Sequence, residues 1–288
     1  MNPGSQAWRA IWKHFGATSK LVFSRYSKVY AGMVCCYAKK YHQLINGNLY
    51  TLDSLKSEYV KTLIIKSLII LSKFLGQNQD FKKKLKDFGI KAYKPDSFAS
   101  FLRILNNNSS DLLNWYKQTL PKLRDNEKLL LKFTLVTGLR RSEAIASFNK
   151  IIELAKKNRI SEYYDSDLQC LQHFKYKETF LRKTKNCYIS FVSKDLISAI
   201  ADSTPVTYPA IRKRLEHRCR INELRDYYGT FMVRHGLIRE EVDLLQGRIP
   251  PSIFIRHYWS PSFKELRDRT LKAISELEQT LNQVSKSN

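Results

Sequence analysis

Several patterns that carry common enzyme chemistries are missing from this chain of 288 residues. It has no P-loop and no GxGxxG fingerprint, so nothing supports a reaction that uses ATP or a dinucleotide. None of its six histidines stands in an HExxH or other paired spacing, and its acidic residues form no cluster of the kind that holds two metal ions. The sequence therefore predicts neither a cofactor nor a metal.

Cysteines and long apolar runs are also scarce. The five cysteines are an odd number without CxxC or zinc spacing, so we expect no disulfide framework and a reducing cytosol. The first residues lack the apolar core of a signal peptide. The most apolar run, residues 63–71, is broken by Lys66 and is too short to span a bilayer. It predicts a buried helix, and we expect no membrane partner.

Acidic residues are few beside the basic ones. The chain has 26 Asp and Glu against 50 Lys and Arg, which gives a formal net charge of +24. A field of this sign attracts polyanions, and nucleic acid is the leading partner. An anionic membrane surface and a generally basic surface are the alternatives. Because the basic residues are spread along the whole chain, they favour a protein that surrounds its polyanion.

Apolar residues recur every three or four positions in the first hundred residues, which predicts a small bundle of helices with a basic face. The expected helices cover residues 20–44, 53–74, 80–89 and 96–105, with Asp53 or Ser54 capping the second. The polar stretch NNNSSD at 106–111 has little that can pack. We therefore predict two domains, residues 1–108 and 109–288.

The second domain is predicted to be mainly helical with a small β-sheet, an α+β fold. Residues 174–181 and 187–193 predict two strands joined by the basic turn RKTKN. The last helix, after Pro261, is amphipathic. The other expected helices cover residues 111–120, 125–138, 141–157, 222–235 and 238–247. The stripe of the last helix consists of Leu266, Leu271, Ile274, Leu277, Leu281 and Val284.

Three arginines stand at expected helix ends or in a helix beside apolar segments: Arg140 in TGLRRSEA, Arg225 in NELR and Arg248 in LLQGR. Each one alone is more often a solvated surface charge. Together they suit a phosphate, because the planar guanidinium fork matches its oxygens. Burying such charges without an anion or carboxylate is costly.

Tyr258 follows the double proline in the segment FIRHYW. A phenol with a pKa of about 10 is a poor nucleophile, but a cluster of cations would favour the phenolate and neutralise charge on an attacked phosphorus. Since the chain has sixteen tyrosines, a simple packing role is the alternative for any one of them. Lys183 and Lys185 in the basic turn are candidate general acids or, alternatively, non-specific phosphate contacts.

These segments, in this order, resemble the motifs of the tyrosine recombinase (phage integrase) family. TGLRRSEA resembles its first arginine motif, NELR its His-x-x-Arg box, LLQGR its Leu-Gly-His segment, and HYW the segment of the nucleophilic tyrosine; KTKN resembles the turn with the catalytic lysine. The resemblance spans roughly residues 115–288. Asn222 replaces the usual His and Arg248 a His or Trp, as in integrases of archaeal spindle-shaped viruses (fuselloviruses) and related plasmids.

The resemblance implies a core-binding domain and a catalytic domain that close on duplex DNA. Attack by Tyr258 would give a 3′-phosphotyrosyl bond and a free 5′ hydroxyl, and strands would exchange through a Holliday junction without ATP or metal. Glu143 would orient the arginines. The implied catalytic set is Arg140, Lys185 (with Lys183 as the alternative lysine), Asn222, Arg225, Arg248 and Tyr258.

The implied function is integration or excision of viral or plasmid DNA in the cytoplasm of an archaeal host. The implied partners are double-stranded attachment sites and, on synapsed DNA, a homotetramer that is a monomer or dimer when free. The C-terminal helix, residues 263–284, is expected to dock on a neighbouring subunit. A type IB topoisomerase-like enzyme and a non-catalytic architectural DNA-binding protein are the competing hypotheses.

Overall fold

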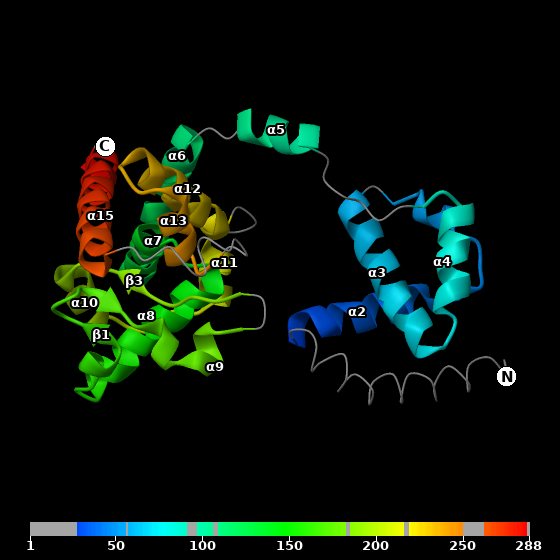
Figure 1. The fold of residues 1–288 in the computed structure, drawn as a ribbon, viewed down its shortest axis with the longest axis horizontal. Coiled ribbons are helices and arrows are strands. Elements are labelled where there is room, and N and C mark those ends of the chain that lie inside the picture. Colours follow the sequence, from blue (N-terminus) through cyan, green and yellow to red (C-terminus); the bar gives the residue numbers. More distant parts are fainter. Residues whose placement is uncertain are drawn as a thin grey trace. The chain divides into compact units, whose positions relative to one another are not determined.

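The computed structural model describes residues 28–55, 57–90, 97–105, 109–182, 185–215, 219–249 and 262–286. These residues form mainly helices and one small antiparallel sheet, which confirms the predicted α+β class. The chain divides into two compact units, Met1–Asn106 and Asn107–Asn288 (Figure 1). In the described ranges, no helix is both long and apolar enough to cross a membrane.

The first unit is built from short helices around its own apolar core. The predicted buried helix is confirmed, because residues 63–71 lie within α3, where Ile64 and Leu68 are fully buried. The predicted cap of α3 is wrong: the hydroxyl of Ser57 accepts from the Val60 N–H at 3.4 Å. The helices are α2 (Lys28–Tyr41), α3 (Glu58–Phe74), α4 (Asn78–Asp87) and α5 (Ser97–Leu105), with 3-10 turns at His42–Ile45 and Tyr50–Leu52.

The second 3-10 turn explains why the cap lies later than expected. This turn occupies the residues just before Asp53, whose backbone N–H donates to the Tyr50 carbonyl at 2.9 Å. The Asp53 carboxylate pairs with Lys61 at 2.7 Å, and the Ser54 hydroxyl donates to the Thr51 carbonyl at 2.8 Å. Both predicted capping side chains are therefore used elsewhere, and the helix begins after Ser57.

The second unit has one continuous core, in which α7 packs against both α8 and α12. Its sheet has the order β1-β2-β3, with antiparallel pairs Tyr164–Leu171 and Cys170–Phe191. The helices are α6 (Ser109–Thr119), α7 (Asp125–Thr137), α8 (Arg141–Lys156), α9 (Lys177–Phe180), α10 (Lys194–Ala201), α11 (Tyr208–Arg214), α12 (Ile221–Arg234), α13 (Arg239–Leu245) and α15 (Phe263–Lys286). The strands are β1 (Tyr164–Asp165), β2 (Cys170–Leu171) and β3 (Ser190–Phe191).

The predicted first strand, residues 174–181, is wrong. The segment contains the 3-10 turn His173–Lys175 and the short helix α9. The rings of Tyr176 and Phe180, one helical turn apart, both pack on the buried Tyr163, with centroid distances of 5.2 and 6.0 Å. The hairpin itself persists, because Leu181 and Asn186 form an antiparallel bridge on either side of the basic turn. Lys183 and Thr184 lie outside the described residues.

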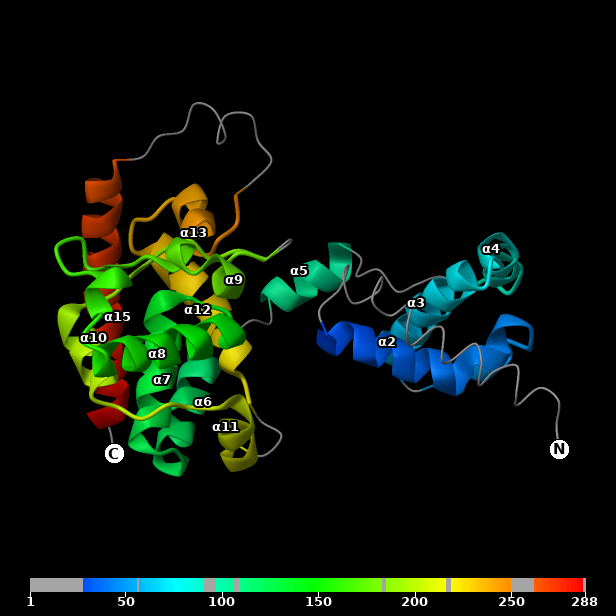
Figure 2. The ribbon, with the colours of Figure 1, turned by 90° about the horizontal axis from the view of Figure 1, so that it is seen from below.

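Most of the apolar stripe of α15 is buried within its own unit, so the chain itself covers this face; docking of the helix on a neighbouring subunit stays a prediction. The helix packs against α6, α7, α12 and β3, and both views place it along one side of the unit (Figures 1 and 2). Its Phe263 ring also contacts Phe191 of β3, at a centroid distance of 5.4 Å. The side chains it buries are Leu266, Thr270, Ala273, Ile274, Leu277 and Leu281.

Candidate active site

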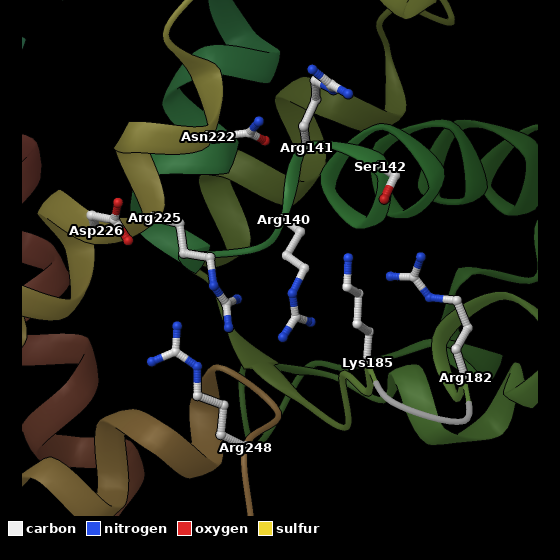
Figure 3. A pocket seen from close by; sticks show the side chains of 9 residues that line it. All are labelled: Arg140, Arg141, Ser142, Arg182, Lys185, Asn222, Arg225, Asp226 and Arg248. Carbon is white, nitrogen blue, oxygen red and sulfur yellow. The ribbon is translucent and has the colours of Figure 1, made fainter. Parts of the chain in front are cut away.

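A pocket of about 410 Å³ in the second unit collects an unusual number of cationic side chains. It brings together five of the six residues proposed from the sequence, which come from the start of α8, the basic hairpin, the first two turns of α12 and the turn after α13 (Figure 3). The sixth, Tyr258, lies outside the described residues. The lining consists of Arg140, Arg141, Ser142, Arg182, Lys185, Asn222, Arg225, Asp226 and Arg248.

Arg140 is held at the junction of two helices. It is the residue before α8, and its Nη1 donates to Glu143 Oε1 at 2.8 Å and to the Asn186 carbonyl at 3.2 Å. Glu143 is only 2% exposed, and its other oxygen accepts from the Arg140 backbone N–H at 3.1 Å. The backbone N–H of Arg140 is therefore already paired and is not available to a ligand. The carboxylate instead fixes both the helix start and the guanidinium.

Gly138 allows the loop between α7 and α8 to pack closely against α12. It ends α7 in the left-handed conformation, with φ +60°, which side chains other than glycine adopt at a cost. A Cβ at this position would lie 2.2 Å from the ring of Tyr228 on α12. Tyr228 is buried in the core of the unit. The close approach sets the loop that precedes Arg140 directly against the helix that carries Arg225.

Arg225 is the most deeply placed cation of the pocket, with 6% of its surface exposed. Its guanidinium donates to the Gly138 carbonyl at 2.7 Å and to the Gln246 carbonyl at 2.6 Å. Both partners are neutral. Burial, reinforced by the charges of Arg140 and Arg248, lowers the pKa of Arg225 to about 10. A buried cation held only by neutral carbonyls is costly, and an anion in the pocket would relieve that cost.

Arg248 enters the pocket from a turn that only glycine can make. Gly247 has φ +67°, and a Cβ there would lie 1.8 Å from the Asn186 carbonyl oxygen. The Arg248 side chain is 54% exposed, and its nearest carboxylate, on Asp243, is 3.4 Å away. Figure 3 shows its guanidinium directed toward those of Arg140 and Arg225. Three guanidinium groups from three separate elements thus converge on one region.

The opposite wall carries Lys185 and a cation that the sequence analysis did not single out, Arg182. Lys185 is exposed and extends from the hairpin toward Ser142 (Figure 3). Arg182 donates from Nη2 to Glu143 Oε1 at 2.6 Å. It is the first residue of the RKTKN turn, but its partner lies 39 positions earlier in the chain. No local pattern indicates such a pair.

Three other residues that line the pocket are Arg141, Asp226 and Asn222. Arg141 points away from the three central arginines, and its guanidinium stacks on the ring of Tyr208 at 3.8 Å. Asp226 is the one carboxylate among the described lining residues. Asn222 is exposed in the first turn of α12, and no hydrogen bond of its amide is found within the described part of the chain. Its amide is free to contact a ligand.

The fold and the pocket define a class of protein. Among the described residues, a mainly helical unit directs several guanidinium groups and the ammonium of Lys185 into one pocket, an arrangement that suits a phosphate group of a nucleic acid. Residues 106–265 match the family model of archaeal phage integrases, so the chain belongs to the archaeal phage integrase family. The match confirms the resemblance found in the sequence and supports a role as an integrase, a recombinase that binds DNA. No curated protein and no solved structure matches the chain.

Proposed function

We propose that this integrase is a tyrosine site-specific recombinase in which Tyr258 attacks the scissile phosphate. The attack forms a 3′-phosphotyrosyl bond and releases a 5′ hydroxyl, and the hydroxyl of a partner strand reverses the step. The observation that carries the proposal is the convergence of Arg140, Arg225 and Arg248 around one region. Among the described residues, the hydrogen-bond acceptors of the buried Arg225 guanidinium are carbonyls and not carboxylates.

The side chains of the three arginines differ in exposure and in how firmly hydrogen bonds hold them, which suggests different roles. Arg225 and Arg140 are fixed by two hydrogen bonds each from their side chains, so they are preorganised for the non-bridging oxygens of a phosphate. Arg248 is more exposed and more loosely paired, so it can close on the phosphate after DNA binds. Preorganised donors stabilise the charge that develops in the transition state without having to reorient.

Lys185 and Asn222 complete the proposed site. The ammonium of Lys185 protonates the 5′ oxygen as the bond from phosphorus to that oxygen breaks. Lys183 is the alternative donor from the same turn. Asn222 cannot take up the phenol proton, but its amide can donate a hydrogen bond to a phosphate oxygen. The loss of the phenol proton then depends on the field of the arginines, which favours the phenolate.

The reaction conserves the energy of the phosphodiester in the phosphotyrosyl ester, so rejoining needs no ATP. We propose that the duplex attachment site is also bound by the first unit, where Lys82, Lys83 and Lys86 of α4 are exposed. Integration or excision requires four active subunits on two synapsed sites, in the cytoplasm of the archaeal host. In this proposal the free protein is a monomer or dimer.

The decisive experiment maps the covalent bond. Fragmented DNA of the host and of the integrating element is incubated with the protein, the mixture is denatured, and the DNA that remains attached is sequenced. Mass spectrometry of the digested adduct identifies the linked residue. We expect a single phosphotyrosyl peptide that contains Tyr258, attached to the 3′ end of the cleaved strand, and we expect Tyr258→Phe to form no adduct.

A matched control separates loss of the nucleophile from loss of any tyrosine. Tyr59 is 68% exposed on α3 of the first unit, and Tyr59→Phe should form the adduct at the wild-type rate. An adduct on another residue, or one that persists in Tyr258→Phe, refutes the proposed nucleophile. Once the site is known, two copies of it on one plasmid distinguish a recombinase, which exchanges them, from a type IB topoisomerase-like enzyme, which only relaxes the plasmid.

A further inference from the structure

Arg182 and Glu143 connect the two walls of the pocket. One carboxylate oxygen, Glu143 Oε1, accepts from Arg140 at 2.8 Å and from Arg182 at 2.6 Å. Arg140 lies among the three central arginines, whereas Arg182 lies at the base of the hairpin that carries Lys185 (Figure 3). Glu143 is almost fully buried, so its position is fixed by the start of α8. The hairpin is therefore tied to the same anchor as Arg140.

Among the described residues, the backbone ladder of the hairpin beside Lys185 is short. Leu181 and Asn186 form one antiparallel bridge, and the Arg182 N–H donates to the Lys185 carbonyl at 3.3 Å. A lysine side chain has four flexible carbons, so fixing its ammonium over a phosphate costs conformational entropy. An ion pair from the adjacent side of the turn lowers that cost, because it fixes the backbone from which the lysine extends.

Building on the function proposed above, we propose that Arg182 is a positioning residue: through Glu143 it holds the hairpin so that the ammonium of Lys185 reaches the 5′ oxygen that leaves the phosphorus. In the step itself, the Tyr258 phenol gives its proton to water, its oxygen bonds to phosphorus, the bond to the 5′ oxygen breaks, and that oxygen takes a proton from Lys185. The lysine then recovers a proton from water. Arg182 exchanges no proton and acts only on the position of the donor.

The alternative role for Arg182 is direct contact with a phosphate. Its side chain is 42% exposed, so it is accessible to DNA. The two roles differ in one respect that can be measured. A residue that acts through the general acid matters only while the leaving group needs a proton, whereas a residue that contacts the phosphate matters for any leaving group.

The test uses attachment-site DNA in which sulfur replaces the bridging 5′ oxygen of the scissile phosphate. A thiol has a pKa of about 8.5, far below that of an alcohol, so the thiolate leaves without a proton. Single-turnover adduct formation is measured with the oxygen and the sulfur ester. We expect Arg182→Ala to slow cleavage of the oxygen ester at least tenfold, part of the roughly 10²–10⁴-fold effect of a general acid. With the sulfur ester its rate should be within about twofold of wild type, the scatter that corresponds to the usual error in additivity.

Three comparison variants separate positioning from other effects. Arg140→Ala should be slow with both esters, because the phosphate needs its guanidinium whatever group leaves. Arg159→Ala removes a guanidinium from a different Arg–Glu pair of the same unit, the exposed pair with Glu162, and should change neither rate. In a Lys185→Ala background, Arg182→Ala should cause no further loss, since the group it positions is already gone.

Two outcomes overturn the inference while leaving the proposed function intact. Either Arg182→Ala slows the sulfur ester as much as the oxygen ester, or it slows neither, while wild type forms the Tyr258 adduct. If wild type forms no such adduct with either ester, the proposed function fails and this inference fails with it. Equal melting temperatures for wild type and Arg182→Ala are expected, because Glu143 keeps its pair with Arg140.

Discussion

Replacing Gly247 by alanine should disable the pocket at a modest cost in stability. The added Cβ would lie 1.8 Å from the Asn186 carbonyl oxygen, whereas such contacts in proteins are longer than 3.0 Å, so the two segments must separate by more than 1 Å. That separation moves Arg248 away from Arg140, because Arg140 donates to the same Asn186 carbonyl. A displacement of about 1 Å in a catalytic group costs roughly 10²-fold in rate.

The stability cost has a separate source and a separate estimate. Gly247 has φ +67°, and holding an alanine in the left-handed region costs roughly 1–2 kcal/mol. In a domain of this size each kcal/mol lowers the melting temperature by about 2–4 °C. We therefore expect a shift of several degrees in thermal unfolding, together with a loss of adduct formation of about 10²-fold or more in single-turnover assays with attachment-site DNA.

Gly236 provides the control within the same unit. It also has positive φ, +95°, but a Cβ there meets nothing within 4 Å. Gly236→Ala should therefore lose stability, as Gly247→Ala does, and should still cleave DNA at the wild-type rate. If Gly247→Ala cleaves within a few-fold of wild type, or if both alanine variants lose activity equally, the contact between the two pocket turns does not set the geometry of the site.

Two further predictions concern DNA binding and the buried core. Binding of a labelled duplex, measured by fluorescence anisotropy, should weaken about 10³-fold or more between 50 and 200 mM salt, as expected for six or more phosphate contacts; a flat profile would remove the extended basic contact with DNA. His173 is buried, with Tyr163 and Ser190 as hydrogen-bond partners, and burial lowers its pKa to about 3. Because the unfolded chain binds the His173 proton near pH 6.5, the free energy of unfolding should fall as the pH drops from 6.5 toward 3, with a contribution of about 1.4 kcal/mol per pH unit from this group. His173→Gln should show a shallower slope in denaturant titrations, and an unchanged slope would contradict the assignment.

The helix ends that carry the arginines could be predicted because their signals are local. Gly138 stops α7 and Gly247 follows α13, each with positive φ, and an arginine stands one or two positions later. The order of these segments indicated the family, which the match over residues 106–265 confirms. Local periodicity also gave the bounds of α7 and α8 to within a residue or two.

What the sequence could not provide depends on contacts between distant segments. Residues 174–181 have aromatic side chains that suit a strand, but packing of Tyr176 and Phe180 on Tyr163 winds them into a helical turn. The stripe on α15 was visible, but a stripe does not say which surface covers it. Arg182 was missed for the same reason, because its role follows from a carboxylate on another element.

In the second unit, three buried carboxylates are each paired with an arginine. The buried Arg225 differs from them, because its hydrogen-bond partners are neutral. Glu127, Glu143 and Glu241 are each the third residue of a helix, and each accepts from the N–H of the residue before that helix. Each of these buried carboxylates also pairs with an arginine from another element: Arg214, Arg182 and Arg269 respectively.

Arg225 is buried almost as deeply as these three carboxylates. Its hydrogen-bond acceptors, however, are backbone carbonyls. A carboxylate in their place would stabilise the folded protein but would also neutralise the charge that a phosphate must meet. The unpaired charge of Arg225 therefore lowers the free energy of unfolding of the free protein. Binding of an anion raises it again, because a ligand that binds only the folded state stabilises that state. In the function proposed above, that anion is the scissile phosphate, and the free protein bears the cost of a buried guanidinium that is not paired with a carboxylate.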